Sequence, residues 1–290
     1  IEPSTGEVLC LVSSPTYDPS LMIGRDRGKN HLAMSKDPWK PLLNRAIMGA
    51  YPPGSTFKTT QALTFLQEGI INTGTMYPCS GGFSYRGLHV GCHAHPSPLS
   101  LIPAIATSCN GYFCWGLYYM IGARQKYGSV QKAMNTWRDY MVSMGFGYQL
   151  GIDLPGEKRG MIPNAQYYDK AYRRSWNGLT IISISIGQGE VTATPLQIAN
   201  LGATIANRGY FVTPHVVKEI EGESIDSIYT TRRYTKVDKG HYEEVVQGMR
   251  SAVLGGTCRT QIFQNWKSAE KRVQRKIMER TILHLWDLLR

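Results

Sequence analysis

Apolar side chains recur every three to four residues along several stretches of the chain, which is the spacing of helices that bury one face. The pattern predicts a helix from Ser55 to about Gly69, directly after the turn-forming Pro52-Pro53-Gly54. The same spacing predicts helices over residues 130–144 and from Pro195 to about Asn207, the second with Thr194 as its N-cap. The first helix matters most, because of two residues near its start.

The longest stretch without a charged side chain runs between His95 and Arg124, and its apolar part is long enough to cross a bilayer. Pro103 and Asn110 interrupt it with polar or helix-breaking positions. A helix buried on all sides of a globular core has the same signature. We therefore expect a buried helix from about residue 101 rather than a membrane span.

Two segments have the pattern of strands, residues 6–12 and residues 210–219, and the turn-rich residues 14–19 follow the first. A further apolar run, residues 179–186, ends at Gly187-Gln188-Gly189-Glu190. Strands and helices are thus expected to mix along the chain.

Composition limits the classes of function. The chain has 290 residues, of which 42% are hydrophobic, enough for a substantial core. The formal charge is +11, but residues 259–290 hold eight Lys or Arg against three Asp or Glu, so the rest is only mildly basic and we expect no nucleic-acid partner. The six cysteines are too scattered for a disulfide scaffold. The first residues read as the middle of a domain, and we expect a fragment whose beginning lies upstream.

Ser55 and Lys58 form an S-x-x-K pair at the start of the first predicted helix. Residues three apart share a helix face, so the hydroxyl and the amine can meet. A lysine with a lowered pKa can take the serine proton, which would make Ser55 a nucleophile for acyl transfer. The alternative is a capping serine followed by a solvated lysine, and the pair alone does not decide between them.

Ser108-Cys109-Asn110 places two polar side chains inside the apolar stretch. Such groups are costly to bury unless their hydrogen bonds are satisfied. Contact with Ser55 and Lys58 would satisfy them and supply a proton path. The alternative is a local bond from Ser108 to its own backbone.

Together the two elements follow the order S-x-x-K, then S-x-N about fifty residues later, that penicillin-binding proteins and class A β-lactamases share. Longer strings strongly resemble the transpeptidase domain of class B penicillin-binding proteins, and most of all its elongation-type members. These strings are Asn44-Arg45, Tyr51-Pro-Pro-Gly-Ser-Thr-Phe-Lys58, Ser108-Cys-Asn-Gly-Tyr-Phe113, Gly151-Ile-Asp-Leu-Pro-Gly156, Gly187-Gln-Gly189 and Thr194-Pro-Leu-Gln-Ile-Ala199.

The resemblance implies a mixed α/β (α+β) fold of the penicillin-binding/β-lactamase-like type over residues 1–260, with an antiparallel sheet flanked by helices. It implies that Ser55 attacks the D-Ala-D-Ala bond of a peptidoglycan stem peptide and that β-lactams acylate the same serine. Lys58 would be the base and Ser108 the proton relay, while Asn110, Gln188 and Gly189 would bind substrate. No cofactor is required in this family. The expected location is the extracytoplasmic face of the plasma membrane, with an anchor upstream and elongation-machinery proteins as partners.

The family also needs a K-T-G tripeptide on a strand beside the site, and the printed sequence contains none. We interpret residues 261–290 as an out-of-frame tail. Restoring one nucleotide after the Thr260 position allows the tail to be recoded as A-N-I-P-E-L-E-I-C-G-K-T-G, followed by further family sequence. The chain would then lack the last strands and the closing helix, and we expect poor stability and little transpeptidation.

A second cluster, Cys79, Cys92, His93 and His95, could hold a structural zinc ion that pins the loop beside the site. Cys109 lies close to it in sequence. The C-x12-C spacing matches no common zinc module, and buried thiols are ordinary, so both interpretations stay open.

Three other classes of function are alternatives to a transpeptidase: a phosphate-binding protein, a non-catalytic penicillin-binding domain and a β-lactamase. Gly49-x4-Gly54-Ser55-Thr56 approximates a phosphate-binding loop, but Ser55 stands in the place of its lysine and two prolines remove N–H donors. Two further alternatives stay open: a β-lactam-sensing or degenerate non-catalytic domain, and a serine β-lactamase. Rapid turnover of penicillin would favour the last.

Overall fold

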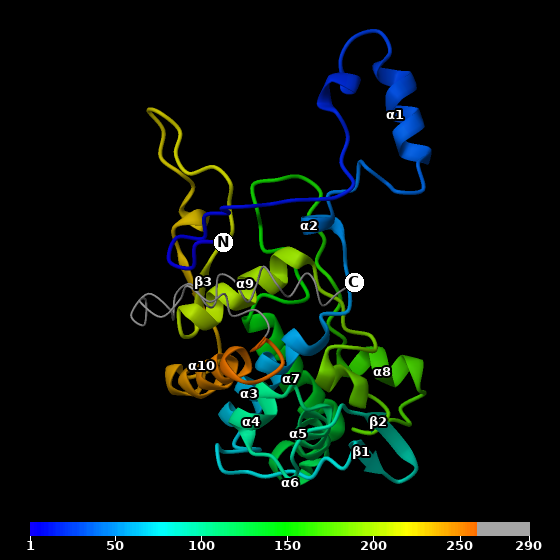
Figure 1. The fold of residues 1–290 in the computed structure, drawn as a ribbon, viewed down its shortest axis with the longest axis vertical. Coiled ribbons are helices and arrows are strands. Elements are labelled where there is room, and N and C mark those ends of the chain that lie inside the picture. The colour runs from blue at the N-terminus through cyan, green and yellow to red at the C-terminus, as the bar shows by residue number, and fades with distance from the viewer. Residues whose placement is uncertain (260–290) are drawn as a thin grey trace.

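A computed structural model describes residues 1–259 of the 290. Figure 1 shows α3–α7 and α10 gathered in one half of the molecule, with α9 and β3 beside them and a lobe around α1 projecting from the far end. The α-helices are α1 Arg27–Lys36, α2 Arg45–Met48, α3 Lys58–Gln67, α4 Leu101–Ala106, α5 Asn110–Gly122, α6 Arg124–Tyr127, α7 Val130–Ser143, α8 Ala165–Ala171, α9 Pro195–Ala206 and α10 Lys239–Leu254. The 3-10 helices are η1 Pro19–Met22, η2 Gly54–Phe57, η3 Ile182–Ile186 and η4 Ser227–Tyr229, and the strands are β1 Gly82–Tyr85, β2 Leu88–Gly91, β3 Tyr210–Val212 and β4 Arg232–Tyr234.

The core is built around α5. Phe113 and Leu117 of this helix are fully buried, and α5 packs on α3, α7, η3 and β1. The approach to α3 is close: a Cβ on Gly116 would lie 2.4 Å from the Phe65 ring. This confirms the expected buried helix, and no helix among residues 1–259 is long and apolar enough to cross a membrane.

Three of the predicted helices form where the pattern placed them. The Ser55 helix begins as η2 and continues as α3 to Gln67, and the segment 130–144 is α7. Pro195 begins α9, and Thr194 caps it in a reciprocal pair of bonds with Gln197. The stretch from residue 101 departs from expectation, because it divides into α4 and α5 at Ser108.

The predicted strands are mostly absent from the described residues. Residues 6–12 form no strand and make a single parallel bridge, Glu7 to His215. Within residues 210–219 only 210–212 form a strand, β3, which pairs with β4. The sheets in residues 1–259 are two antiparallel hairpin-like pairs, β1–β2 and β3–β4. A strand-like segment forms a ladder only beside a partner strand. Leu9 and Val12 instead stay exposed, at 65% and 67%.

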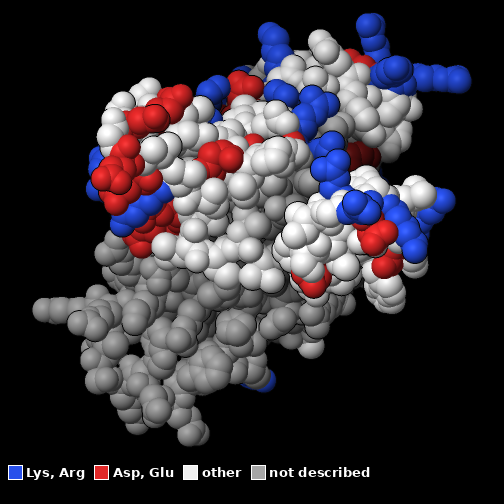
Figure 2. All heavy atoms as spheres, turned by 90° about the horizontal axis from the view of Figure 1, so that it is seen from above, with Lys and Arg blue, Asp and Glu red and all other residues white. Residues whose placement is uncertain are grey.

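Charged side chains are mixed on the face shown in Figure 2. Lys and Arg project from several places there, and Asp and Glu lie among them. The expected division into a domain over 1–260 and a tail over 261–290 remains a prediction, since the tail lies outside the described residues.

Candidate active site

The turn that carries Ser55 is held from both sides. Tyr51 exchanges two backbone hydrogen bonds with Ala193, at 2.9 and 2.8 Å, and the Thr56 hydroxyl donates to the Pro53 carbonyl at 2.7 Å. Ser55 itself is exposed in η2, immediately before α3 begins. Its hydroxyl has no hydrogen-bond partner in the part of the chain that the structure describes, so it is free to meet a ligand.

The Gly187-Gln188-Gly189 turn lies directly against the Ser55 turn. The Gly54 N–H donates to the Gly187 carbonyl at 2.9 Å, and Gly187 has φ +69°. A Cβ on Gly187 would lie 2.2 Å from the Gly54 oxygen, so only glycine fits. The predicted binding residues Gln188 and Gly189 are therefore beside Ser55, and both are exposed.

Lys58 is the buried centre of the site. Only 3% of it is exposed, and its Nζ donates to the Ser108 carbonyl at 2.6 Å, the Ser108 Oγ at 2.9 Å and the Asn110 Oδ1 at 2.6 Å. Three acceptors match the three N–H donors of an ammonium group. The S-x-x-K and S-x-N elements thus meet, as expected, but Lys58 contacts Ser108 and Asn110 rather than the Ser55 hydroxyl.

Ser108 lies in a sharp turn and not inside a helix, which corrects the sequence prediction. Its φ is +53°, a left-handed conformation that L-residues adopt at a cost. The turn ends α4 and lets Cys109 cap α5, where its Sγ accepts the Tyr112 N–H at 3.3 Å. As a result the Ser108 hydroxyl faces Lys58 instead of bonding to its own helix.

Asn110 is oriented by the end of β2. Its Nδ2 donates to the Gly91 carbonyl at 2.8 Å, and its backbone N–H donates to the Cys92 Sγ at 3.2 Å. These bonds leave Oδ1 directed at Lys58. Sequence reasoning missed both Gly91 and the supporting role of Cys92, because nothing in the local pattern reports that β2 ends beside α5.

Burial changes the acid–base properties of Lys58. Desolvation lowers the pKa of its amine from 10.5 to about 8, and negative charge on the neighbouring Cys92 and Cys109 sulfurs acts in the opposite direction. A substantial fraction of the amine is therefore neutral near pH 8. A neutral lysine amine is the form that can accept a proton.

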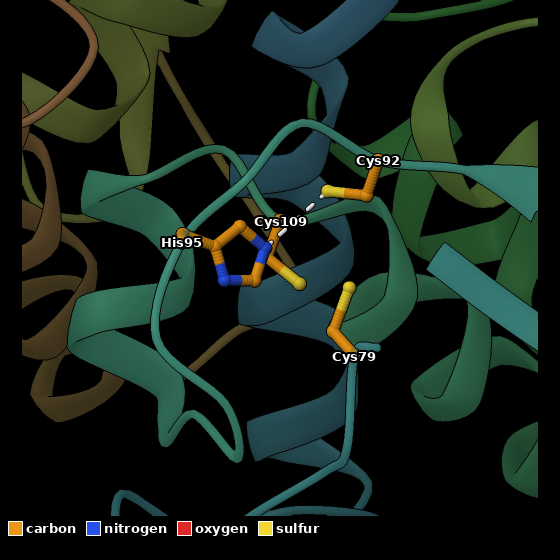
Figure 3. Close-up of side chains that lie close together, drawn as sticks. All are labelled: Cys79, Cys92, His95 and Cys109. Atoms are coloured by element: carbon orange, nitrogen blue, oxygen red, sulfur yellow. Dashed lines mark hydrogen bonds between the residues drawn. The ribbon is translucent and has the colours of Figure 1, made fainter. Parts of the chain in front are cut away.

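Four side chains beside this site form a separate cluster: Cys79, Cys92, His95 and Cys109 (Figure 3). Their ligand atoms all lie within 4.8 Å of one another. Figure 3 shows the three sulfurs and the imidazole directed towards a common centre. Three of these residues, Cys79, Cys92 and His95, belong to the cluster that the sequence predicts.

The fourth member of the cluster differs from the predicted set, since Cys109 lies where the sequence interpretation places His93. His93 follows the end of β2 and is not among the four residues whose ligand atoms lie within 4.8 Å of one another. The His93 Nδ1 lies 4.0 Å from the Cys92 Sγ, and its ring packs edge-on against His95. Cys109 reaches the cluster from the start of α5.

The donor set fits a tetrahedral zinc ion. Thiolates and imidazole are the ligands zinc prefers, and tetrahedral Zn–S bonds place sulfurs about 3.8 Å apart. The Cys92 Sγ lies 3.4 Å from the His95 Nε2, and the other ring nitrogen, Nδ1, lies 2.8 Å from the Pro96 carbonyl. A proton on Nδ1 would donate to that carbonyl and leave the Nε2 lone pair facing the sulfurs.

Comparison with known proteins agrees with this geometry. The penicillin binding protein transpeptidase domain family matches residues 1–272. The peptidoglycan D,D-transpeptidase MrdA of Acinetobacter baumannii is 36% identical over 231 residues, which cover 77% of this chain and 32% of the relative. The chain therefore spans about a third of the length of that curated relative.

Solved structures show the same fold. Pseudomonas aeruginosa PBP2, in complex with WCK 5153, has a TM-score of 0.75 at 29% identity, over 90% of this chain and 58% of the other. A complex between PBP2 and MreC from Helicobacter pylori has a TM-score of 0.69 at 27% identity, over 87% and 44%. Penicillin-binding protein A of Mycobacterium tuberculosis, as its penicillin G acyl-enzyme complex, has a TM-score of 0.63 at 26% identity, over 87% and 56%. The chain belongs to the penicillin-binding-protein transpeptidase domain family, among its class B, PBP2-type members.

Proposed function

We propose that this chain carries the acylation site of a peptidoglycan D,D-transpeptidase, with Ser55 as the nucleophile. The observation that carries the proposal is the buried Lys58 amine, held by Ser108 and Asn110 at 2.6–2.9 Å one helical turn from an exposed serine. A solvated lysine after a capping serine, the alternative to catalysis, would be neither buried nor bonded to the second motif. The relatives' names support the reaction class.

The reaction would proceed in two transfers. The neutral Lys58 amine takes the proton of Ser55, and the Ser55 oxygen attacks the carbonyl carbon between the two D-alanines. Ser108 passes a proton to the leaving nitrogen and takes one from Lys58 in its place, and D-alanine departs while the acyl group stays on Ser55. The amine of a second stem peptide then attacks the ester and restores the Ser55 hydroxyl. The Ser55 N–H would supply half of the oxyanion hole.

The residues proposed to contact substrate are those that lie around Ser55 and Lys58. Asn110 would hold the peptide amide as well as Lys58, and Gln188 and Gly189 would line the opposite side of Ser55. β-Lactams would acylate the same serine, and the penicillin G acyl-enzyme complex of the M. tuberculosis relative supports this assignment. The solved complex of PBP2 with MreC supports a protein partner of the MreC kind. The elongation role and the extracytoplasmic location are proposed from the family resemblance.

We further propose that the printed chain acylates poorly, because its sequence contains no K-T-G tripeptide. The matched comparison is a repaired chain, in which residues 261–290 are replaced by the in-frame peptide A-N-I-P-E-L-E-I-C-G-K-T-G and its continuation. Strong labelling of the printed chain by a fluorescent penicillin would contradict this proposal. The nucleotide sequence after the Thr260 codon decides the frame itself.

The test of the proposed function is covalent labelling of the repaired chain. We expect a fluorescent penicillin to bind one site, and mass spectrometry of the digest to place it on Ser55. Ser55→Ala should remove the label, while Ser80→Ala, at another exposed serine, should keep it. A label on another residue would refute the assignment. A stable adduct supports a transpeptidase or sensor, and rapid release supports a β-lactamase.

The pH dependence of labelling follows from the lowered pKa of Lys58. Below about pH 8 the amine is mostly protonated, so the acylation rate of the repaired chain should rise about tenfold per pH unit and level off above pH 8. The rate is measured from pH 6 to 9.5 with stability followed in parallel. A rate that stays flat between pH 6.5 and 9 would exclude Lys58 as the base.

We also propose a structural zinc ion bound by Cys79, Cys92, His95 and Cys109. Cys109 lies between Ser108 and Asn110, so the ion would anchor the turn that holds Lys58. Burial raises the pKa of the Cys109 and Cys79 thiols, and zinc must displace their protons, so zinc affinity should rise with pH. The ion would add no step to the reaction.

Two neighbouring histidines test the zinc site. His95→Ala removes a proposed ligand and should weaken zinc binding by about 100-fold or more. His93→Ala is the matched control and should leave the zinc content near one per chain. Zinc is measured by plasma mass spectrometry after purification without added metal. Equal loss in both variants, or no zinc in the parent chain, would refute the site.

A further inference from the structure

Two of the cluster's three thiols lie at the neck of the β1–β2 hairpin. Gly82 pairs with Gly91 at the open end of this hairpin, and the Cys92 N–H donates to the Gly81 carbonyl at 2.8 Å. Cys92 thus sits directly after β2, and Cys79 lies three residues before β1 begins. The hairpin itself brings these two cysteines together.

The third thiol, that of Cys109, has a structural role at the start of α5. The Cys109 side chain is fully buried, and its Sγ caps α5 by accepting the Tyr112 N–H. A covalent bond to Cys109 would weaken this cap at the start of the central helix. Cys92 is partly exposed, so a reagent in solution reaches it first. The favoured pair is therefore Cys92 with Cys79.

We propose that Cys79 and Cys92 form a reversible disulfide that loosens the Lys58–Asn110 arrangement and slows acylation. Their sulfurs lie within 4.8 Å, so they must approach by less than about 3 Å to reach a bond length near 2.05 Å. The same two sulfurs cannot be joined and also bind zinc. Oxidised and metal-bound forms would therefore exclude each other.

The oxidant is a disulfide of low molecular weight, such as oxidised glutathione. The Cys92 thiolate attacks one of its sulfurs, forms a mixed disulfide and releases one thiol. The Cys79 thiolate then attacks the Cys92 sulfur and releases the second thiol. Two cysteine thiols are oxidised to one disulfide, and one disulfide is reduced to two thiols. The two protons pass to the released thiols.

The disulfide would act on Asn110 through the end of β2. Two of the groups that orient Asn110 are the Gly91 carbonyl and the Cys92 Sγ. Turning the Cys92 sulfur towards Cys79 removes the acceptor of the Asn110 N–H and shifts the adjoining Gly91 carbonyl. Asn110 then holds Lys58 less firmly. The expected slowing of acylation rests on the proposed function, whereas the disulfide, the freed N–H and the looser Lys58 contact do not.

The decisive experiment uses the 290-residue chain of the printed sequence, made metal-free with EDTA. Cys10→Ser and Cys258→Ser are introduced together, so that the thiols outside the core do not react. The chain is equilibrated with reduced or oxidised glutathione. Peptide mapping should find the Cys79–Cys92 link only in the oxidised sample. Hydrogen exchange at the Asn110 amide should speed up about fivefold or more, while α10 is unchanged. Dithiothreitol should reverse both changes.

A parallel measurement separates this inference from the proposed function. In the repaired chain, oxidised glutathione should lower the rate of Ser55 labelling at least about fivefold, and Cys79→Ser should remove that sensitivity. No labelling of the reduced repaired chain would count against the proposed function, and the mapping and exchange would still decide the inference. A link that joins Cys109, the absence of any link, or a Cys79–Cys92 link with unchanged Asn110 exchange would overturn it.

Discussion

Lys58→Met in the repaired chain is expected to lower the rate of Ser55 labelling by about 1000-fold, the range in which a general base contributes. Methionine is of similar length and keeps the contact with Phe113, whose ring centre lies 6.0 Å from the Lys58 Nζ. What it removes is the proton acceptor. The variant no longer desolvates an amine, but three acceptors lose their donor, so the free energy of unfolding should fall by about 1–3 kcal/mol and is measured in parallel. The rate is measured by quenched-flow labelling with a fluorescent penicillin.

Lys58→Arg separates the base from the positive charge. Arginine keeps a cation and N–H donors for Ser108 and Asn110, but it does not lose its proton at these pH values. We expect labelling as slow as in Lys58→Met, at every pH from 6 to 9.5. Lys126→Met, at a half-exposed lysine that pairs with Glu68, is the control and should label normally. Labelling of Lys58→Arg within tenfold of the parent would show that charge, not proton transfer, is what Lys58 supplies.

The residues of the site could be named from the sequence because they belong to two short motifs. Ser55 and Lys58 lie on one helix turn, which periodicity locates, and S-x-N supplies the second motif. Their meeting across 50 residues of chain could be expected only from the resemblance. The geometry of Ser108 could not, since its left-handed φ arises from the way α4 ends and α5 begins. Ser108 and Asn110 mark this place as polar, but residue type alone does not say that the chain turns there instead of continuing one helix.

The supporting residues were harder to predict, because their roles depend on where distant segments end. Gly91 and Cys92 orient Asn110 only because β2 ends against the start of α5. Cys109 belongs to the cluster of Cys79, Cys92 and His95 because α5 begins beside it, and spacing in the sequence does not report that neighbourhood. The three other members were recognisable by residue type alone.

The prediction of strands failed for a different reason. Residues 6–12 contain a short apolar run of the kind that forms strands, but a ladder requires a neighbour that satisfies its N–H and C=O groups. Within residues 1–259 this segment finds only the bridge to His215. Helices make their backbone bonds internally, so α7 and α9 could be predicted from their own sequence. Predicting a strand thus requires knowing which other segment lies beside it, and the local sequence does not contain that information.

The contact between the two turns of the site leads to the second large effect. Gly187→Ala would place a Cβ 2.2 Å from the Gly54 oxygen and 2.8 Å from the Gly54 nitrogen. The Ser55 turn must then move away from the Gly187-Gln188-Gly189 turn, and the bond from the Gly54 N–H is lost. A displacement of about 1 Å at a reacting group costs on the order of 100-fold in rate. We expect a loss of that size in labelling of the repaired chain.

Gly69→Ala provides the matched control for Gly187→Ala. Gly69 has φ +62°, close to the +69° of Gly187, but a Cβ there would meet nothing within 4 Å. It should therefore show only the left-handed backbone cost of about 1–2 kcal/mol in the free energy of unfolding, with normal labelling. Gly187→Ala adds the collision and should lose about 3 kcal/mol or more, measured by urea unfolding. If both variants lose the same stability and both label normally, the turn at Gly187 does not position Ser55, because backbone strain alone would then account for its glycine.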